Sequence, residues 1–357
     1  MPTSSSAAWT RYWARRNRRV AGEYTPEVMA DLERMVARGL SCWQLSAATA
    51  IKLLNVSENA TFALSDPSSG RELVLRVHRV GYCTADEIRS ELAWINALRD
   101  DAIIETAAPI AGRDGELVHT FESPAGRPSR YAVAFERLPG REPDAGVSTV
   151  QWFERLGELS ARMHAHARAW RLPSGFRRKR WDLDAMVGPN GFWGPWRAAI
   201  GLDASGIAKL ERALSFIAER LGRFGTGPER FGLIHADLRL ANLLVSEPHL
   251  RIIDFDDCGF SWFLYDFASA VSFIEHEPIV PALLRAWLTG YRRVATLSNE
   301  ELAEIPTLVV LRRILLMAWL ASHAEIPFAR QFGVAYTAGT LALAEQLQRG
   351  RLLNQVS

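Results

Sequence analysis

One stretch of the chain, GLIHADLRLANLLVSEPHLRIIDFDDCG at residues 232–259, combines apolar, strand-like runs with a His, an Asn and a series of Asp residues. A carboxylate that is buried without a partner is unfavourable by several kcal/mol, so acids beside buried strands need positive charge close to them. The stretch therefore predicts that these side chains gather around a cation.

Length, charge and cysteine usage limit the class of protein. A chain of 357 residues is long enough for two domains. The net charge of +2 favours neither nucleic acid nor an anionic membrane as a partner. Three cysteines without the spacing of metal ligands are typical of a reducing compartment, and no secretory signal is visible. We therefore expect a cytoplasmic protein, a monomer or a homodimer, that binds neither nucleic acid nor membrane.

The longest apolar run, TLVVLRRILLMAWLA at residues 307–321, contains Arg312 and Arg313. Two charges in the middle of the run predict a buried helix rather than a membrane span. Helical periodicity continues through most of the chain after residue 264.

Two changes of pattern divide the chain into three parts. Residues 1–44 are expected to form a helical N-terminal extension whose arginines lie on a solvated face. Residues 45–138 carry short alternating runs that predict an antiparallel sheet of five strands, with one helix over residues 84–99 after the third strand. Residues 139–357 are mostly helical. The predicted fold class is α+β, with a β-rich N-terminal lobe and a mostly helical C-terminal lobe.

The apolar runs LLV and RII lie on either side of the turn-like sequence SEPH. This pattern predicts a β-hairpin that brings Asn242 and Asp254 together, each with a side-chain oxygen. Mg²⁺ takes oxygen ligands, usually one or two from the protein, with phosphate and water completing the shell. We therefore predict Asn242 and Asp254 as metal ligands, with Asp237 nearby to orient a hydroxyl group.

These residues resemble a known family. His235-x-Asp237, followed by Asn242 and by Asp-Phe after a short hairpin, resembles the catalytic and metal-binding loops of protein-kinase-like enzymes. IHADL stands where the aminoglycoside phosphotransferase and choline kinase superfamily shows His-Gly-Asp-Leu, and IDFDDCGFSWFLYDFASA is similar to its Ile-Asp-Phe segment. LLNVSENATF resembles its nucleotide loop. The resemblance covers residues 45–345 and is nearest to the stress-response kinase and type II homoserine kinase-like branch.

The resemblance implies a two-lobe protein-kinase-like fold and an enzyme that uses ATP and Mg²⁺. Asp237 would accept or orient the proton of the substrate hydroxyl, and Arg239 would stabilise charge on the transferring group. The metal ligands named above would hold Mg²⁺ on the nucleotide phosphates. Asp266 would brace the catalytic loop, and His235 would support its geometry.

Nucleotide-binding residues are also implied by the resemblance. Ser57 and Asn59 belong to the nucleotide loop. On the strand LVLRVHR, Val74 would lie against adenine while Arg76 points to the phosphates. Glu91 on the following helix would be the partner of Arg76.

The segment FERLPG resembles the hinge, where backbone groups of Glu136 and Leu138 would hydrogen-bond adenine. Arg76 departs from the superfamily, which normally has Lys at that position. Arginine keeps the charge but is bulkier and forked. The departure leaves a nucleotide-binding scaffold with little turnover as one alternative.

The leading interpretation is an ATP-dependent phosphotransferase that acts on a hydroxyl of a small molecule, such as an aminoglycoside, an amino alcohol or a homoserine-like compound. A Ser/Thr protein kinase of the stress-response type is a second alternative, although no activation-loop segment with an Ala-Pro-Glu-like ending follows Asp254. Glu275 and Glu277 could supply acids for a cationic acceptor. No residue decides the acceptor.

Other polar and aromatic residues have simpler interpretations. The run RRKR at residues 177–180 is expected to be a solvated loop. His164 and His166 are expected to pack in a helix or lie at the surface. Trp193 and Trp196 are either core residues or walls of an acceptor pocket.

Overall fold

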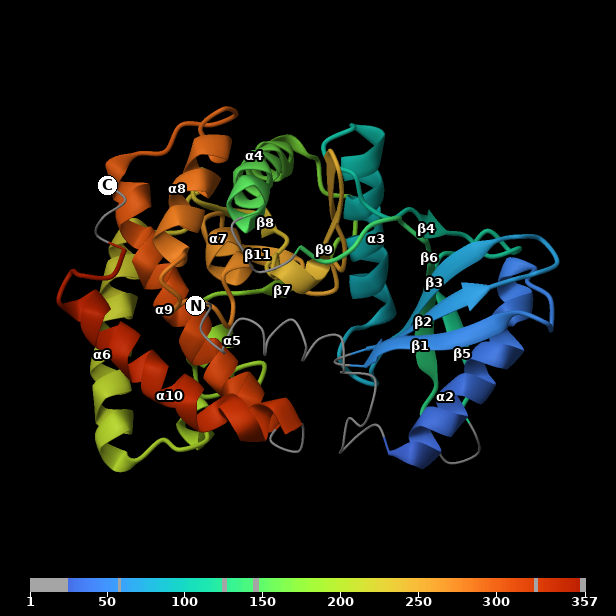
Figure 1. Cartoon of the computed structure of the whole chain (residues 1–357), viewed down its shortest axis with the longest axis horizontal. Helices are drawn as coiled ribbons and strands as arrows, with labels where there is room; N and C mark the ends of the chain where they lie inside the picture. The colour runs from blue at the N-terminus through green and yellow to red at the C-terminus, as the bar shows by residue number, and fades with distance from the viewer. Residues whose placement is uncertain (1–24, 57–58, 124–126, 144–147, 324–326, 354–357) are drawn as a thin grey trace. The chain divides into compact units, whose positions relative to one another are not determined.

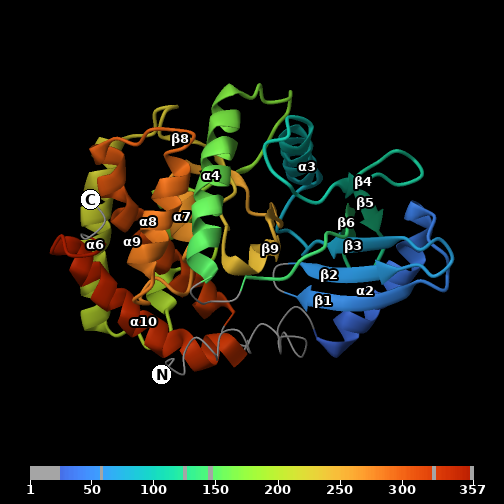
Figure 2. The same cartoon turned by 45° about the horizontal axis from the view of Figure 1, so that its top comes forward.

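The computed structural model describes residues 25–56, 59–123, 127–143, 148–323 and 327–353. The described residues form two compact units, one within Met1–Gly140 and Leu172–Arg177 and the other within Arg141–Arg171 and Arg178–Ser357. One unit is built around a sheet and the other mainly from helices (Figures 1 and 2). The predicted α+β class is confirmed. Residues 172–177, which the sequence pattern assigned to the second lobe, belong to the first unit.

An antiparallel sheet of six strands forms the first unit. Its strands are β1 Ala50–Val56, β2 Ala60–Ser65, β3 Glu72–Val77, β4 Pro109–Ile110, β5 His119–Phe121 and β6 Arg130–Glu136. The strand order is β1-β2-β3-β6-β4, and β5 also pairs with β6. The sequence predicted five strands. The described sheet has one strand more than this, in the part where β4 and β5 have only two and three residues.

The core of the first unit lies between this sheet and two N-terminal elements, α2 Pro26–Gly39 and the 3-10 helix η1 Leu40–Trp43. The buried cluster that they share with the strands includes Leu32, Met35, Val36, Phe62 and Leu75. Residues 25–44 are therefore part of the sheet's core, whereas the sequence pattern set residues 1–44 apart as an extension. The apolar stripe of α2 predicts that one face of the helix is buried. It does not show what packs on that face, because the periodicity is the same whichever element covers it.

The helix predicted after the third strand is α3 Ala85–Asp100. It begins with a capping box, in which the side chains of Thr84 and Glu87 each accept a hydrogen bond from the other residue's N–H. Alternate residues of β3 belong to the core with α2, so Val74 and Arg76 lie on the opposite face of the strand. This face carries the predicted nucleotide-binding side chains.

The second unit consists mainly of helices, as predicted. They are α4 Ser148–Ala169, α5 Leu183–Val187, η2 Trp196–Ala198, α6 Ala204–Phe224, α7 Tyr265–Ala270, α8 Val280–Tyr291, α9 Asn299–Ser322 and α10 Pro327–Gln348. α4 packs along α8, and α9 contacts α6, α7 and α10 (Figure 1).

Two small sheets interrupt these helices. β7 Lys179–Arg180, β11 Gly259–Trp262 and β8 Phe231–Ile234 form one, in that order. The other is the predicted hairpin of β9 Leu243–Ser246 and β10 His249–Ile252, which is confirmed. A 3-10 turn, η3 Leu240–Asn242, leads from the loop after β8 into β9.

The apolar run around Arg312 and Arg313 forms the centre of α9. Among the described helices, α9 alone is long and apolar enough to cross a membrane, and 78% of its most apolar window is buried inside the structure. The prediction of a buried helix is confirmed.

Close packing of α4 on α8 depends on two glycines. A Cβ at Gly157 would overlap the backbone of Trp287, and one at Gly290 would overlap the backbone of Glu154. We expect Gly157→Ala to lower the free energy of unfolding by about 1–3 kcal/mol, because a backbone atom cannot move aside as a side chain can. Gly222→Ala in α6 is the matched control, since a Cβ there meets nothing within 4 Å.

Urea unfolding of both variants checks this expectation. The control is expected to raise the free energy of unfolding by about 0.4–1 kcal/mol, because alanine loses less conformational entropy on folding. A Gly157→Ala variant as stable as the control would contradict the close approach of α4 and α8.

Candidate active site

The loop between β8 and β9 carries the predicted catalytic residues, and its backbone is held by α7. The carboxylate of Asp266 accepts hydrogen bonds from the N–H groups of His235 at 3.3 Å and Ala236 at 2.7 Å. The N–H of Leu238 donates to the hydroxyl of Ser269 at 3.0 Å. The prediction that Asp266 braces this loop is confirmed.

Ala236 has a left-handed backbone conformation, with a φ angle of 68°. This conformation is unfavourable by about 1–2 kcal/mol for any residue that has a Cβ atom. Ala236 stands where the resembled superfamily shows Gly, which adopts a positive φ without this strain. The hydrogen bond to Asp266 holds the strained peptide in place.

His235 links the catalytic loop to the end of the hairpin. Its Nδ1 accepts a hydrogen bond from the N–H of Asp237 at 3.2 Å, and its Nε2 lies 3.1 Å from the carbonyl oxygen of Ile253. Burial lowers the pKa of His235, so the imidazole is neutral and Nε2 donates. His235 therefore has the supporting position that the resemblance implied.

His164 of α4 is a second support that sequence reasoning missed. Its Nε2 lies 3.0 Å from the carboxylate of Asp266, and its Nδ1 lies 3.0 Å from the hydroxyl of Tyr291. Burial lowers its pKa, which favours the neutral ring. The prediction that it packs in the helix was incomplete, because the contact with Asp266 joins segments that are far apart in the sequence.

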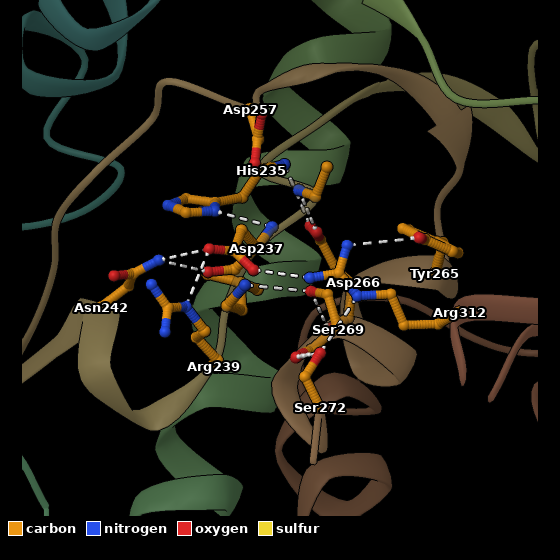
Figure 3. Close-up of polar contacts among 12 residues, drawn as sticks. His235, Asp237, Arg239, Asn242, Asp257, Tyr265, Asp266, Ser269, Ser272 and Arg312 are labelled. Atoms are coloured by element: carbon orange, nitrogen blue, oxygen red, sulfur yellow. Dashed lines mark hydrogen bonds and ion pairs between the residues drawn. The ribbon is translucent and has the colours of Figure 1, made fainter. Parts of the chain in front are cut away.

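Both carboxylate oxygens of Asp237 are bonded (Figure 3). Oδ1 accepts a hydrogen bond from Nη2 of Arg312 at 2.7 Å. Oδ2 accepts from Nε of Arg239 at 3.0 Å and from Nδ2 of Asn242 at 2.8 Å. Burial alone would raise the pKa of Asp237, but the charges of Arg239 and Arg312 outweigh it and the pKa is lowered. Asp237 is therefore an ionised carboxylate that can accept a hydrogen bond from a hydroxyl group.

The hairpin brings the chain segments of the two predicted metal ligands together. The N–H of Ile253 donates to the carbonyl oxygen of Asn242 at 2.9 Å, and Asp254 follows directly. The Nδ2 of Asn242 donates to Asp237, and in Figure 3 the Asn242 side-chain oxygen points away from Asp237. Asp254 is exposed and has a φ angle of 64°. One amide oxygen and one exposed carboxylate fit a cation that completes its shell with phosphate and water.

A metal held by protein side chains alone would need more ligands than these two. Within the described ranges, no group of three or more His, Cys, Asp or Glu residues could hold a metal ion. The two predicted ligands therefore suit an ion that arrives with a phosphate group, as Mg²⁺ does with a nucleotide. Their role as metal ligands stays a prediction.

The loop between β10 and β11 is held by two basic residues. Arg178 donates to the carbonyl oxygens of Cys258, at 2.7 Å, and Asp256. The Nζ of Lys179 lies 2.9 Å from Oδ1 of Asp257. The interpretation of RRKR as a solvated loop is wrong for Arg178 and Lys179, which are both buried. The reason is that β7 pairs with β11, so the run belongs to a sheet rather than a free loop.

Arg312 of α9 belongs to this site, although the sequence showed it only as a charge that interrupts an apolar run. Its side chain is 3% exposed and pairs with Asp237. The signal that could have revealed it is the charge itself, because an arginine in the centre of a buried helix needs a partner. Trp193 lies beside it, with its ring centroid 5.7 Å from the guanidinium carbon. Trp193 and Trp196 are both buried core residues.

Glu275, one of two acids suggested for a cationic acceptor, already has partners. Its Oε2 lies 2.5 Å from Nη1 of Arg313, and its Oε1 accepts from the hydroxyl of Tyr336 at 2.9 Å. Its side chain is completely buried. The buried ion pair neutralises the carboxylate, so the suggestion that Glu275 binds a cation is corrected. Glu277 lies at the surface side of this segment, 3.6 Å from the ring of His276.

In the first unit, Arg76 and Glu91 form a buried ion pair, as predicted. Nη2 of Arg76 lies 2.7 Å and 2.8 Å from the two carboxylate oxygens of Glu91. The guanidinium carbon also lies 5.1 Å from the ring centroid of Phe135. Val74, on the same face of β3, is half-buried. This group places a cation beside an apolar surface.

Three further predicted nucleotide-binding residues, Asn59, Glu136 and Leu138, are described and lie in the same unit. The side-chain oxygen of Asn59 accepts a hydrogen bond from the N–H of Arg79 at 3.1 Å. Ser57 lies outside the described residues. The N–H of Glu136 donates to the carbonyl oxygen of Ala108 at 2.8 Å, so a contact of Glu136 with adenine would use its carbonyl oxygen. Leu138 follows β6 and is half-buried.

The family described as "Phosphotransferase enzyme family" matches residues 50–297. The structure of a microcompartment-associated aminopropanol kinase is 41% identical, with a TM-score of 0.83, and the alignment covers 90% of this chain and 99% of that chain.

Two amicoumacin kinases are also similar. One, solved in complex with AMP-PNP, Ca²⁺ and Ami, is 20% identical with a TM-score of 0.75, over 94% of this chain and 100% of that chain. This likeness is one of fold alone. The amicoumacin kinase of Bacillus subtilis (strain 168) is 25% identical over 194 residues, which are 52% of this chain and 55% of that protein. The match thus spans about half the length of this curated relative.

Proposed function

Because the chain belongs to the phosphotransferase enzyme family, we propose that it transfers the terminal phosphoryl group of ATP to the hydroxyl group of a small amino alcohol. The predicted superfamily and protein-kinase-like fold are confirmed by the family match and by the aminopropanol kinase structure. The observation that carries the proposed reaction is the ionised carboxylate of Asp237, held by three side chains in a braced loop.

In the helical unit, we assign roles to four residues. Asp237 accepts a hydrogen bond from the acceptor hydroxyl and orients its oxygen for attack on phosphorus. Its lowered pKa suits orientation of the hydroxyl better than early removal of its proton. Arg239 stabilises charge that develops on the transferring group. Asn242 and Asp254 hold Mg²⁺, which when bound neutralises charge on the phosphates.

In the sheet unit, we assign nucleotide binding to the face of β3 that carries Arg76. Arg76 contacts the phosphates, and its ion pair with Glu91 fixes the direction of the guanidinium. Val74 lines the adenine pocket, where the backbone of Glu136 and Leu138 provides the hydrogen bonds. These assignments rest on the buried pair and on the position of both side chains on one strand.

A small acceptor is favoured over a protein by the likeness to an aminopropanol kinase, which extends over nearly the whole of both chains. The ammonium group of such an acceptor needs an acidic or aromatic partner. Glu275 is not that partner, because its side chain is completely buried and both of its carboxylate oxygens are bonded.

An ATP-consumption screen tests the proposal. The compounds are 1-amino-2-propanol, ethanolamine, choline, homoserine, an aminoglycoside and a generic protein substrate, each with the Asp237→Asn variant as the background control. We expect the highest kcat/KM with a small amino alcohol. Phosphorylation of the protein substrate alone would instead support a Ser/Thr kinase, and no turnover with any acceptor would support the scaffold alternative.

Arg76 provides a separate prediction. Arg76→Ala is expected to lower kcat/KM by about 10²–10³-fold, the range for loss of one donor that stabilises developing charge. Arg76→Lys is not expected to be neutral, because lysine has a different reach and no fork. Steady-state kinetics with ATP as the varied substrate measures both effects, and full activity in Arg76→Ala would contradict the assignment.

The control for the Arg76 variants also replaces Glu91, the acid that Arg76→Ala would leave without a partner. Arg76→Ala leaves the completely buried Glu91 without its partner, which destabilises a fold by itself. The double variant Arg76→Met with Glu91→Gln leaves no uncompensated buried charge. If it folds and still shows no ATP-dependent rise in Tm, the defect is in nucleotide binding rather than in folding.

A further inference from the structure

The guanidinium of Arg312 has a separate partner for each of its three nitrogens. Nη2 donates to Oδ1 of Asp237 at 2.7 Å, and Nε donates to the hydroxyl of Ser272 at 3.1 Å. Nη1 lies 3.4 Å from the hydroxyl of Tyr265. Figure 3 shows the side chain reaching from α9 between these groups toward Asp237. A planar fork held at three points has little freedom to change direction.

Two of these partners belong to the segment that also holds the catalytic loop. The hydroxyl of Ser272 donates to the carbonyl oxygen of Ser269 at 2.7 Å, and the hydroxyl of Ser269 accepts from the N–H of Leu238. Asp266, in the same segment, accepts from the N–H groups on the other side of Asp237. One segment therefore holds the backbone around Asp237 directly and its side chain through Arg312.

Stability alone does not account for this arrangement. A buried ion pair is typically no more stabilising than apolar residues of the same volume, because both charges lose their hydration. Arg312 is 3% exposed and lies in the middle of an otherwise apolar helix. A charge in this place is better explained by what it does to the direction of the Asp237 carboxylate.

Arg239 differs from Arg312 in both position and exposure. It contacts the other carboxylate oxygen, Oδ2, and its side chain is 17% exposed. It comes from the catalytic loop itself, whereas Arg312 comes from the core of the helical unit. Oδ1 is thus tied to the core, and Oδ2 faces the groups that are proposed to meet the nucleotide and the acceptor.

We propose that Arg312 is a positioning residue, which anchors Oδ1 of Asp237 so that Oδ2 is presented to the acceptor hydroxyl. The inference rests on the proposed function, in which Asp237 orients that hydroxyl. It predicts that Arg312 affects the rate of phosphoryl transfer and not the binding of nucleotide, since Asp237 is the one proposed site residue with which the described structure gives Arg312 a hydrogen bond.

Two matched lysine variants on adjacent residues of α9 test the role. Arg312→Lys keeps the charge but replaces three nitrogens that each have a partner with a single nitrogen. We expect kcat to fall by about 10²-fold, as for a misplacement of a reacting group by about 1 Å. The KM for ATP is expected to stay unchanged. Arg313→Lys keeps a charge beside Glu275, outside the site, and is expected to retain kcat. An equal loss of kcat in the two variants would overturn the inference.

Rescue by a small molecule separates positioning from folding. In Arg312→Ala, guanidinium chloride at millimolar concentration is expected to restore part of kcat, because the ion can occupy the space of the missing group. The same salt is expected to restore nothing in Asp237→Asn. If Arg312→Ala has a normal Tm and keeps its kcat without the salt, Arg312 has no positioning role.

A crystal structure of Arg312→Ala makes the test independent of activity. We expect the Asp237 carboxylate to rotate away from its position in the intact protein, since Arg239 and Asn242 hold only Oδ2. An unchanged Asp237 would overturn the inference even if the enzyme is active. If Asp237 rotates but the intact protein phosphorylates no acceptor, the proposed function fails while the positioning role stands.

Discussion

Asp237→Asn is expected to lower turnover by about 10²–10⁴-fold, the usual range for loss of a positioned base or orienting group. Nucleotide binding is expected to stay nearly intact, because Asp237 is bonded to Arg312, Arg239 and Asn242 and is proposed to meet the acceptor. Asparagine has the same shape but turns one acceptor oxygen into a donor, which then faces the N–H donors that surround it. The variant therefore loses both the charge and the hydrogen bond that orients the hydroxyl.

Two measurements separate catalysis from binding in this variant. The first is kcat with the best amino alcohol, and the second is the affinity for Mg-ATP by calorimetry. The Asp237→Asn change leaves the buried Arg312 without its charged partner, which can destabilise the fold by itself. The Tm of the variant is therefore recorded as well. Asp257→Asn is the matched control, because it makes the same change at a neighbouring acid that pairs with Lys179. Equal losses of nucleotide affinity and turnover in Asp237→Asn would argue against the assigned role.

Local patterns explain why part of the site could be predicted. The hairpin β9–β10 depends on two short apolar runs and the turn between them, all within a few residues of each other. Asn242 and Asp254 are placed by that hairpin, and Asp237 precedes it in the same loop. The helix α3 likewise begins at a capping box formed by two residues that are three positions apart, Thr84 and Glu87. Contacts between residues that are close together in the chain can therefore be predicted from the local sequence pattern.

Contacts between distant segments explain what was missed. Arg312 meets Asp237 across 75 positions, and His164 meets Asp266 across 102. His164 does not change the helical periodicity of α4, and Arg312 is visible in α9 only as a charge within an apolar run. Glu275 gave the opposite error: an acid that looked available is paired with Arg313 in the core. A charged residue inside an apolar helix indicates a buried ion pair, but the sequence does not show which residue is its partner.

The second large effect is expected at Asp254, the exposed acid after the hairpin. Its removal should abolish Mg²⁺-dependent nucleotide binding, because Asn242 alone supplies a single neutral oxygen. Asp254 has a φ angle of 64°, a conformation that alanine adopts only with strain of about 1–2 kcal/mol. Asp254→Asn and Asp254→Gly are therefore better variants than Asp254→Ala. Asparagine tolerates the left-handed conformation and keeps an oxygen, and glycine adopts it freely.

The measurement is the effect of ATP on stability with and without Mg²⁺. A ligand at 100 times its Kd stabilises a fold by about 2.7 kcal/mol, so the intact protein should show a clear rise in Tm when both ATP and Mg²⁺ are present. Both Asp254 variants are expected to keep the Tm of the free protein and to lose this rise. If ATP still raises the Tm of Asp254→Gly only when Mg²⁺ is added, another residue holds the metal. If ATP raises the Tm of the intact protein equally without Mg²⁺, nucleotide binding does not depend on the metal. The assignment of Asp254 as a metal ligand would then be wrong, because its carboxylate would repel the phosphates.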